Sequence, residues 1–471
     1  MLNQTLQEKY PHLEISVLKL SEVQKDNESK RIDSEFFKKE YFDAMETMQL
    51  NQVEYLGDNM KFNSRYSQPK YDETSKIKVI NSQYIRNEYI DYENAKSGYG
   101  KIVPKESVLI NATGVGTLGR VFINILDFDF SIDSHINVIV VKNKTYLNPY
   151  FLAIFLQSYY GQIQIIRYYS GTSGQIEIYP RDFNYFKIPI FPMEFQLEIQ
   201  NLAKDSHKAL EESKELYKKA EETLYLELGL DPKNPLQSLL DSKTNNPTNS
   251  PNISIHTLKE SFLKTGRLDS EYYQSKYEDI EKFIKSYPNG YDSFSSIINN
   301  KDTNFTPKNN ENYSYIELAN IGNNGNISEP ISDLGKNLPT RARRIVSKGD
   351  VIISSIEGSL SSCALITQEF DKHLVSTGFF VLNSKLLNGE TLLVMFKSQI
   401  FQEYLKKFPS GTILCAINKE ELSKILIPKI DSTTQEKIAK YIQESFNLRK
   451  KSKQLLDNAK IKVEEQIQGK I

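Results

Sequence analysis

The first segment that could do chemistry is the glycine-rich run Gly114-Val-Gly116-Thr-Leu-Gly119. Its G-x-G-x-x-G spacing is the one with which dinucleotide-binding proteins surround a pyrophosphate. Such a site needs a helix directly after the glycines, whereas residues 120–125, RVFINI, are β-branched and aromatic and favour a strand. We therefore predict a tight turn between two strands and no bound cofactor. The turn is either purely structural, or it also brings the side chains of Thr117 and Arg120 against DNA.

Other catalytic patterns do not stand out in the sequence. The five histidines, at positions 12, 135, 207, 256 and 373, are scattered, and neither Cys363 nor Cys415 has the spacing to a histidine of a zinc site. Both cysteines are predicted to be small core residues. Residues 147–151, LNPYF, lack the second proline of the N-P-P-Y signature of adenine methyltransferases and are expected to start a helix from Tyr150 to Tyr160. The chain is therefore expected to have no catalytic and no metal-binding residues.

Local basic clusters suggest contact with nucleic acid. Residues 331–350 contain five bases and two acids, and residues 61–101 contain eight bases and five acids interleaved with six tyrosines. The alternatives are a solvated basic face and tyrosines that fill a core. The turns Ser170-Gly-Thr172 and Ser410-Gly-Thr412 offer further hydroxyl and amide groups. The residues predicted to face DNA are Thr117, Arg120, Thr172, Ser173, Arg341, Arg343, Arg344 and Thr412.

The order of these segments shows that the chain is duplicated. Arg31-Ile-Asp-Ser-Glu-Phe-Phe37 returns as Arg267-Leu-Asp-Ser-Glu-Tyr-Tyr273, at an offset of 236 residues. Chance similarity does not preserve both order and spacing, so we predict two similar halves. The other matches, with offsets up to 243, are Val108–Ile110 with Val351–Ile353, Gly116–Leu118 with Gly358–Leu360, Ser170–Thr172 with Ser410–Thr412, Ile188-Pro189 with Ile427-Pro428, and Gln196 and Ile199 with Gln435 and Ile438.

Each half ends in a long charged segment that reads as a helix. The first runs from Met193 to Leu228, and the second from Ser432 to Ile467, opening with Ser432-Thr-Thr-Gln435 as a capping box. Spacings of three and four residues predict a coiled-coil seam on both. The predicted seam residues are Leu202, Ser206, Ala209, Ser213, Leu216, Ala220 and Thr223, flanked by Leu210, Tyr217 and Leu224, and in the second helix Ile438, Ile442, Ser445, Ser452, Leu455, Ala459 and Val463.

The charges of the two segments favour their pairing. The first carries nine acids and five lysines, while residues 431–471 carry nine bases and six acids. An antiparallel pair of about 36 residues at ~1.5 Å each would form a rod of ~54 Å. The alternative is that each helix caps a separate domain. Between the halves, the proline- and asparagine-rich residues 231–252 read as a linker.

Composition bounds the remaining possibilities. The chain has 471 residues, 39% hydrophobic residues and a formal net charge of −1. Phosphate contacts must therefore come from local clusters. The N-terminus lacks the pattern of a signal peptide, and no apolar run reaches the ~18 residues of a membrane span. We expect a cytoplasmic protein without a membrane partner.

These features together resemble the specificity subunits of Type I restriction-modification enzymes, over essentially the whole chain. The resemblance rests on the duplicated halves, on the Gly116-Thr-Leu-Gly-Arg120 turn after an apolar strand, and on the Gly171-Thr172 turn before Ile188-Pro189. The second half departs from the pattern, because Ser361-Ser362 stands where the first half ends its glycine turn and Glu357 adds an acid. Base contacts therefore cannot be transferred from one half to the other.

The resemblance implies an α+β fold. Two similar mixed α/β target-recognition domains would be separated by a long antiparallel two-helix coiled coil, with a pseudo-two-fold internal repeat. The predicted ranges are 1–190 for the first domain, 191–230 for the central spacer helix, 231–252 for the linker, 253–429 for the second domain and 430–471 for the C-terminal spacer helix.

The resemblance also implies a non-catalytic subunit that binds double-stranded DNA. Each domain would read one half of a bipartite target. Methyltransferase subunits would use S-adenosylmethionine to methylate adenine, and a nuclease and translocase subunit would use ATP and Mg²⁺ for cleavage. Two alternatives stay open. One is the recognition subunit of a two-component system with a fused methyltransferase and nuclease, and the other is a protein-interaction scaffold that does not bind DNA.

Overall fold

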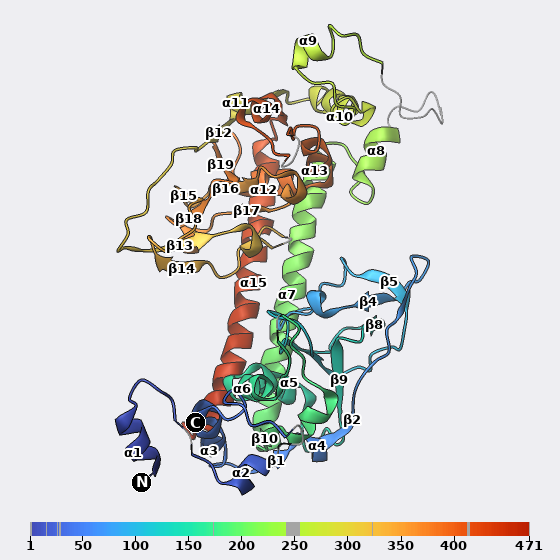
Figure 1. Cartoon of the computed structure of the whole chain (residues 1–471). Coiled ribbons are helices and arrows are strands. Elements are labelled where there is room, and N and C mark those ends of the chain that lie inside the picture. The colour runs from blue at the N-terminus through green and yellow to red at the C-terminus, as the bar shows by residue number, and fades with distance from the viewer. Residues whose placement is uncertain are drawn as a thin grey trace. The chain divides into compact units, whose positions relative to one another are not determined.

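The chain forms two compact units. The computed structural model describes residues 2–15, 17–25, 27, 30–172, 174–241, 255–322, 324–411 and 415–470. Unit 1 contains residues 1–211 and 449–471, and unit 2 contains residues 212–448. Figure 1 labels many of the elements of both units. The predicted linker falls partly on residues 242–254, which lie outside the described residues, while its first part forms helix α8 (Pro235–Asp241) with Leu239 in the core of unit 2.

The centre of unit 1 is an antiparallel four-stranded sheet in the order β2-β9-β6-β7. Every residue of β6 is buried, and successive side chains enter different cores: Val108 and Ile110 pack with α5 and α6, and Leu109 packs on the opposite face. A strand buried on both faces is apolar throughout, which explains the run Val-Leu-Ile. The strands are β1 (Val53–Tyr55), β2 (Met60–Arg65), β3 (Lys70–Tyr71), β4 (Lys78–Ile80), β5 (Lys96–Tyr99), β6 (Val108–Asn111), β7 (Val121–Ile123), β8 (Phe130–Ile132), β9 (Ile136–Val141) and β10 (Lys187–Pro189).

Helices cover one face of this sheet. Asn148 caps α5, because its side chain accepts hydrogen bonds from the backbone N–H groups of Tyr150 (2.9 Å) and Phe151 (3.4 Å), and Pro149 occupies the first helical position. The predicted single helix from Tyr150 to Tyr160 is divided at Ser158, whose extended backbone ends α5 and starts α6. The helices are α1 (Leu2–Lys9), α2 (Leu20–Gln24), α3 (Lys39–Met48), α4 (Leu56–Asn59), α5 (Pro149–Gln157) and α6 (Tyr159–Tyr168).

Unit 2 repeats this sheet with the order β12-β19-β16-β17. In β16, Val351 and Ile353 enter the core beneath α12 and α13, and Ile352 enters the core on the other face. Helices are α9 (Phe262–Thr265), α10 (Ser275–Lys285), α11 (Phe294–Ile297), α12 (Gly389–Lys397), α13 (Gln399–Leu405) and α14 (Lys419–Lys424). Strands are β11 (Tyr291–Ser293), β12 (Ile298–Asn300), β13 (Asn312–Ile316), β14 (Ile331–Leu334), β15 (Ala342–Ile345), β16 (Val351–Ser354), β17 (Cys363–Leu365), β18 (Leu374–Ser376), β19 (Phe379–Ser384) and β20 (Leu426–Pro428).

The smaller sheets show both the repeat and its variation. The pair β1-β10 in unit 1 corresponds to β11-β20 in unit 2. Each unit also has a four-stranded sheet with a parallel pair, β4 with β8 and β13 with β18, but the outer strands differ, with the orders β3-β5-β4-β8 and β14-β13-β18-β15. The predicted internal repeat of mixed α/β halves is therefore confirmed, with these outer strands among the differences.

One buried glutamine fixes the start of the long helix in each unit. Gln196 accepts a hydrogen bond from the Asn148 backbone N–H (2.7 Å) and donates to the carbonyl oxygens of Tyr146 (3.0 Å) and Phe191 (2.7 Å). Gln435 makes the same bonds with the N–H of Asn388 (2.9 Å) and the carbonyls of Leu386 (3.0 Å) and Ile430 (2.9 Å). The predicted capping box at Ser432 was wrong, because Asp431 accepts the Thr433 N–H (2.8 Å) while Gln435 points inward.

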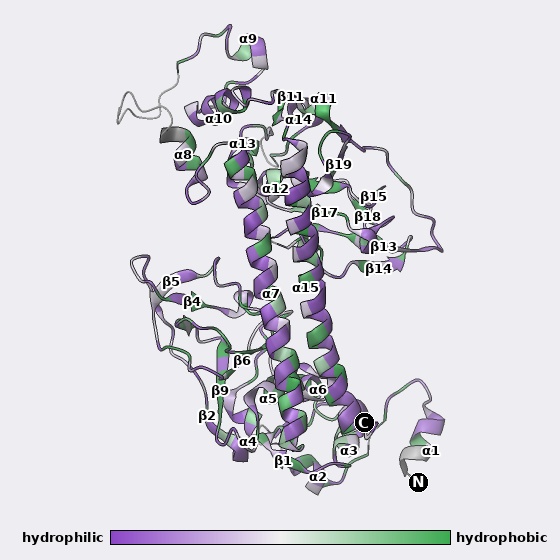
Figure 2. Cartoon of the chain, turned by 180° about the vertical axis from the view of Figure 1, so that it is seen from behind, coloured by the Kyte–Doolittle hydropathy of each residue, from purple (hydrophilic) through white to green (hydrophobic). Residues whose placement is uncertain are grey.

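The long helices are α7 (Met193–Glu227) and α15 (Ser432–Ile467). In unit 1, Ser206 and Ser452 face each other with hydroxyl oxygens 3.0 Å apart, and in unit 2, Ser213 and Ser445 do so at 3.1 Å. The two helices are therefore antiparallel, as predicted, and Figure 2 shows their mixed polar and apolar surfaces.

The buried stripe on these helices is shifted from the predicted one. Leu202, Leu216 and Leu455 are only partly buried, because a strict alternation of three and four residues places their neighbours Ala203, Tyr217 and Leu456 in the seam. The observed seam residues are Ile199, Ala203, Ser206, Leu210, Ser213, Tyr217, Ala220 and Leu224 on α7, and Ile438, Ile442, Ser445, Ser452, Leu456, Ala459 and Val463 on α15.

Two further expectations concern cysteines and membranes. Cys363 is buried, and this burial raises the pKa of its thiol to about 12. Cys415 is only partly buried and donates to the Gly411 carbonyl at 3.2 Å, so it is not the core residue that was predicted. The second expectation concerns membrane-spanning helices. None of the helices that the structure describes has the length and hydropathy required to cross a membrane.

Candidate nucleic-acid interface

Two loops from distant parts of the sequence meet in each unit. The glycine loop contains residues 112–120 in unit 1 and 355–362 in unit 2. The Ser-Gly-Thr loop spans residues 170–178 and 410–417, of which 170–172, 174–178, 410–411 and 415–417 are described by the structure. In unit 1 the Gly114 N–H donates to the Ile176 carbonyl (3.0 Å) and the Ile178 N–H donates to Ala112 (2.9 Å). In unit 2 the Glu357 N–H donates to the backbone carbonyl oxygen of Cys415 (3.0 Å), and the Ile417 N–H donates to that of Ser355 (2.8 Å). Each pair of loops therefore forms one backbone-linked surface.

The glycine loop of unit 1 connects two paired strands. Gly114, Gly116 and Gly119 have φ angles of 91°, 78° and 82°, which side chains with a Cβ rarely adopt. The strand β7 follows directly and pairs antiparallel with β6. A dinucleotide site would require a helix N-terminus there. The three glycines are therefore needed for the backbone conformation of the turn between β6 and β7.

The Ser-Gly-Thr loops close on themselves in the same way. Ser170 and Glu177 exchange two backbone hydrogen bonds of 2.8 Å, and Ser410 and Ala416 exchange bonds of 3.0 and 3.1 Å. Gly171 has a φ of 112°, and a Cβ there would lie 2.0 Å from the Gln175 carbonyl oxygen. Glycine is therefore required at this position.

Glutamines on the neighbouring helices connect to the glycine loops. Gln162 on α6 donates to the Gly119 carbonyl oxygen (2.9 Å), and Gln402 on α13 donates to that of Leu360 (3.2 Å). The two glutamines are 240 residues apart, so this contact belongs to the internal repeat. It fixes each loop against a helix in the core of its own unit.

The side chains predicted for DNA contact in unit 1 have different environments. Arg120 donates to the carbonyl oxygens of Gly116 (2.7 Å) and Ile85 (3.3 Å), and burial followed by the charge of Arg86 lowers the pKa of its guanidinium. Thr117 donates to the Thr113 carbonyl at 2.8 Å. Thr172 is exposed, and Ser173 lies outside the described residues. Arg120 and Thr117 thus shape the loop, and Thr172 is open to a partner.

The predicted arginines of unit 2 lie on or beside the edge strand β15. Arg341 is exposed, and its carbonyl accepts the Thr377 N–H (2.9 Å), while the adjacent Gly378 carbonyl accepts the Ser355 N–H (2.9 Å). This connection places Arg341 close to the glycine loop of unit 2. Arg343 is partly buried and donates from Nε to the Thr340 carbonyl oxygen (2.8 Å).

The third arginine of this cluster points into the unit. Arg344 donates to the Phe379 carbonyl oxygen, and burial lowers the pKa of its guanidinium. Thr412, the remaining predicted residue, lies outside the described residues. Which of the eight residues contact DNA stays a prediction.

The structure adds residues that the sequence patterns did not indicate. Val115, between two glycines at the tip of the turn, is 67% exposed. Tyr179 directly follows the Ser-Gly-Thr loop, is exposed, and has the guanidinium carbons of Arg65 and Arg181 at 5.8 and 5.3 Å from its ring centroid. Arg65 is already paired with Glu177 and with the Ile178 carbonyl oxygen, so the exposed Arg181 and the Tyr179 ring are the groups here that suit phosphate and base contact. The sequence Tyr179-Pro-Arg181 directly after the loop could have indicated Tyr179 and Arg181 as contact residues. Arg65 lies on β2, far away in the sequence, and no sequence pattern connects it with them.

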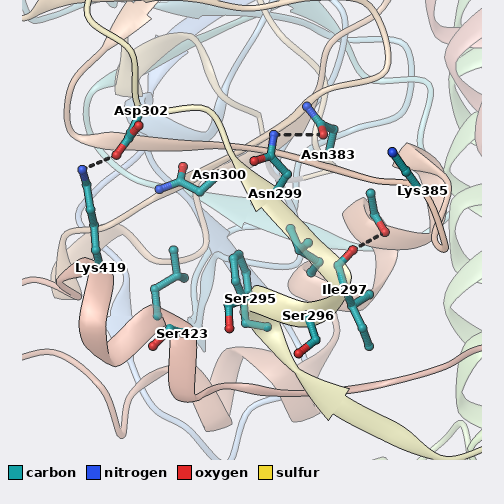
Figure 3. A pocket seen from close by; sticks show the side chains of 14 residues that line it. Ser295, Ser296, Ile297, Asn299, Asn300, Asp302, Asn383, Lys385, Lys419 and Ser423 are labelled. Atoms are coloured by element: carbon teal, nitrogen blue, oxygen red, sulfur yellow. Dashed lines mark hydrogen bonds and ion pairs between the residues drawn. The ribbon is translucent and has the colours of Figure 1, made fainter.

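A cavity of about 570 Å³ lies elsewhere in unit 2, between α11, β12 and α14. Figure 3 shows that its polar side chains contact one another: Lys419 pairs with Asp302, and Asn299 donates to Asn383 at 3.3 Å. The hydrogen bond from Lys419 lowers the pKa of Asp302. No cluster of three or more histidine, cysteine or acidic ligands was found among the residues that the structure describes.

Comparison with known proteins identifies the class of domain. Residues 43–221, from α3 to within α7, match the family model of the Type I restriction modification DNA specificity domain. Over these residues, which are less than half of the chain, the protein is similar to that domain family.

A curated relative agrees with the family. The HindI specificity subunit of a Type I restriction enzyme from Haemophilus influenzae is 29% identical over 129 residues, which are 26% of this chain and 28% of the relative. The matched stretch thus spans less than a third of the relative's length.

Solved structures with similar elements cover more of the chain. The S subunit of a Type I restriction-modification system from M. genitalium is 13% identical and covers 88% of this chain and 95% of its own, with a TM-score of 0.42. The HsdS subunit of Thermoanaerobacter tengcongensis is 14% identical over 89% of this chain and 97% of its own, with a TM-score of 0.28. Both TM-scores lie below 0.5, so the fold rests on the strand orders given above.

Proposed function

We propose that this chain is the DNA-recognising specificity subunit of a Type I restriction-modification complex, in which each unit reads one half of a bipartite target. The carrying observation is that the specificity domain of residues 43–221 has a partner of the same sheet order in unit 2. Two similar readers on one chain match a target with two specific parts. Their different outer strands suit the reading of two different sequences.

The two linked loops of each unit supply the contact surface in this proposal. Exposed groups on them include Thr172, Val115 and the neighbouring Tyr179, and Arg341 lies close to the loops of unit 2. Hydroxyl and guanidinium groups bind phosphates and base edges, and an aliphatic side chain packs on the thymine methyl group. We propose that α7 and α15, which both continue from one unit into the other, act as the spacer between the two readers.

The chemistry in this proposal belongs to partner subunits. A methyltransferase chain would supply S-adenosylmethionine for adenine methylation, and a nuclease and translocase chain would supply ATP and Mg²⁺ for cleavage. The present chain would select the site at which they act, in the cytoplasm, where the DNA is found.

The deciding experiment maps methylated adenines. The chain would be co-produced with the methyltransferase encoded beside it, and DNA from the host would be sequenced for N6-methyladenine. We expect one motif with two specific parts separated by unspecified bases. Methylation without a two-part motif, or absence of salt-dependent duplex binding by the complex, would contradict the proposal and favour a scaffold. A co-purified partner with fused methyltransferase and nuclease would instead indicate the two-component system.

A further inference from the structure

The most similar segment of the two halves lies outside the two loops. In Arg31-Ile-Asp33, Nε and Nη2 of the arginine donate to the two carboxylate oxygens of Asp33, both at 2.7 Å. In Arg267-Leu-Asp269, the same atoms donate to Asp269 at 2.8 and 2.6 Å. We call each arginine with its aspartate an arginine fork. The bidentate pairing fixes the plane and direction of the guanidinium group.

The remaining donor of each fork crosses to a distant segment. Arg31 Nη1 donates to the carbonyl oxygens of Arg167 (3.1 Å) and Tyr169 (2.7 Å), at the end of α6. These carbonyls have no partner within the helix, and the end of a helix carries a partial negative charge. A fixed guanidinium is therefore a suitable cap for them.

Unit 2 contains the equivalent contacts. Arg267 Nη1 donates to the carbonyl oxygens of Lys407 (3.4 Å) and Phe408 (3.3 Å), and Nη2 donates to that of Pro409 (2.8 Å). The side chains of Arg31 and Arg267 are only 21% and 13% exposed. The guanidinium groups of both forks are therefore largely sheltered from water, whereas the carboxylates of Asp33 and Asp269 are 45% and 46% exposed.

The capped carbonyls lie directly before the Ser-Gly-Thr loops. Tyr169 precedes Ser170, and Pro409 precedes Ser410. The far end of each loop is fixed by its backbone bonds to the glycine loop, through Ile178 in unit 1 and Ile417 in unit 2. The fork fixes the near end. It adds a side-chain anchor directly before Ser170 and Ser410, which also exchange backbone hydrogen bonds with Glu177 and Ala416.

We propose that Arg31 with Asp33, and Arg267 with Asp269, are positioning residues that set the Ser-Gly-Thr loop of their own unit for DNA reading, so that each fork controls only one half of the target. This inference rests on the proposed function. Both forks make the same contacts in the two halves of the duplicated chain, and each donates to backbone carbonyls directly before the Ser-Gly-Thr loop of its own unit.

The first test measures loop position without DNA. Arg31→Lys keeps the positive charge but lacks the two-pronged fork, and hydrogen exchange followed by mass spectrometry would compare it with the unchanged protein. We expect exchange in residues 170–178 to become at least about tenfold faster, with residues 410–417 unchanged. Arg267→Lys should give the reverse pattern. Unchanged exchange in both loops would overturn the proposal.

The second test measures specificity in the complex. Methylated adenines would be mapped for Arg31→Lys and Arg267→Lys, each co-produced with the partner methyltransferase. We expect discrimination to fall about tenfold in one half of the motif for each variant, the size of one lost base contact, with the other half unchanged. A uniform loss of methylation with both halves intact would show a merely structural role and contradict the inference.

A charge-exchanged variant serves as the matched control. Arg31→Asp with Asp33→Arg restores an ion pair but moves the guanidinium two residues away from the α6 carbonyls. We expect it to behave like Arg31→Lys, and recovery of normal specificity would overturn the role of the carbonyl contacts. If the unchanged protein gives no two-part motif, the proposed function fails, whereas a two-part motif unaffected by all variants rejects the forks alone.

Discussion

Arginines in this protein differ by what their guanidinium groups already contact. Arg120 and Arg344 donate to backbone carbonyls of their own units, and burial lowers the pKa of both. Arg341 is exposed beside the glycine loop of unit 2. Only a group that is not already committed can exchange water for a phosphate at little cost. DNA affinity should therefore depend most on Arg341 within the 341–344 cluster.

Replacement of Arg341 by alanine tests this expectation. We expect weaker binding to every duplex alike, and a slope of log affinity against log salt that is smaller by about 1, because one phosphate contact is lost. Fluorescence anisotropy over a salt series measures both quantities. Lys440→Ala, an exposed base on α15, is the matched control. A loss confined to one sequence would instead assign a base contact to Arg341.

The fork of unit 2 predicts a pH dependence of stability. The hydrogen bond from Arg267 lowers the pKa of Asp269 below its ordinary value of 3.8. The ion pair therefore stabilises the folded protein fully at pH values above the pKa that Asp269 has in the unfolded chain. This stabilisation is lost as the pH falls through the lower pKa of Asp269 in the folded protein. Asp269→Asn should lower the melting temperature at pH 7, and the difference should shrink as the pH falls below the ordinary pKa of 3.8. Circular dichroism melts over a pH series measure this difference in melting temperature, with Glu278→Gln as the control variant. A difference between Asp269→Asn and the unchanged protein that does not vary with pH would mean that the ion pair is unimportant.

At the scale of elements, the seam of α7 and α15 is specified by polar as well as apolar residues. Ser206 donates to the Ser452 carbonyl (2.8 Å), and Ser445 donates to the Ser213 carbonyl (2.7 Å). Ser206 and Ser445 are 239 residues apart, as are Ser213 and Ser452. Each unit therefore contains the same contact with the helices exchanged. A buried hydroxyl tolerates few other neighbours, so these serines favour one register.

This exchange predicts an asymmetry between the serines. Ser206→Ala removes the hydroxyl group that donates to the Ser452 carbonyl oxygen, and it leaves the Ser452 hydroxyl buried without its partner. We expect the free energy of unfolding to fall by about 1–3 kcal/mol. Ser452→Ala leaves Ser206 bonded to the carbonyl and should cost less. Ser445→Ala and Ser213→Ala should repeat this order in unit 2. Urea titrations of the four variants would contradict the interpretation if the order were reversed in either unit.

At the scale of the whole molecule, attraction to DNA must be local. The formal net charge is −1, with 59 basic and 60 acidic residues, so the chain has no overall positive field. In the proposed function, specific contact would depend on the loop surfaces of the two units and on Tyr179 and the arginines beside them. We expect such binding to be weak for one unit and much stronger when both are engaged.

The salt dependence of the intact chain tests this view. We expect affinity for a duplex with the full two-part motif to fall steeply with salt, with a slope that approaches twice that for a duplex containing one part. Electrophoretic mobility shifts of the purified complex with both duplexes provide the measurement. Equal slopes would mean that only one unit contacts DNA.

The sequence by itself determined the repeat, the strand β6 and the two long helices, because these follow from local patterns: collinear matches, an apolar run and a three-four spacing. The exact seam was missed, since Leu202 and Ala203 are adjacent and only the partner helix selects between them. The tertiary structure alone decided which loops meet, since residues 112–120 and 170–178 are joined by backbone bonds that carry no side-chain signature. It also decided that Arg31 reaches the Tyr169 carbonyl oxygen, because this contact depends on the packing of a helix far along the chain.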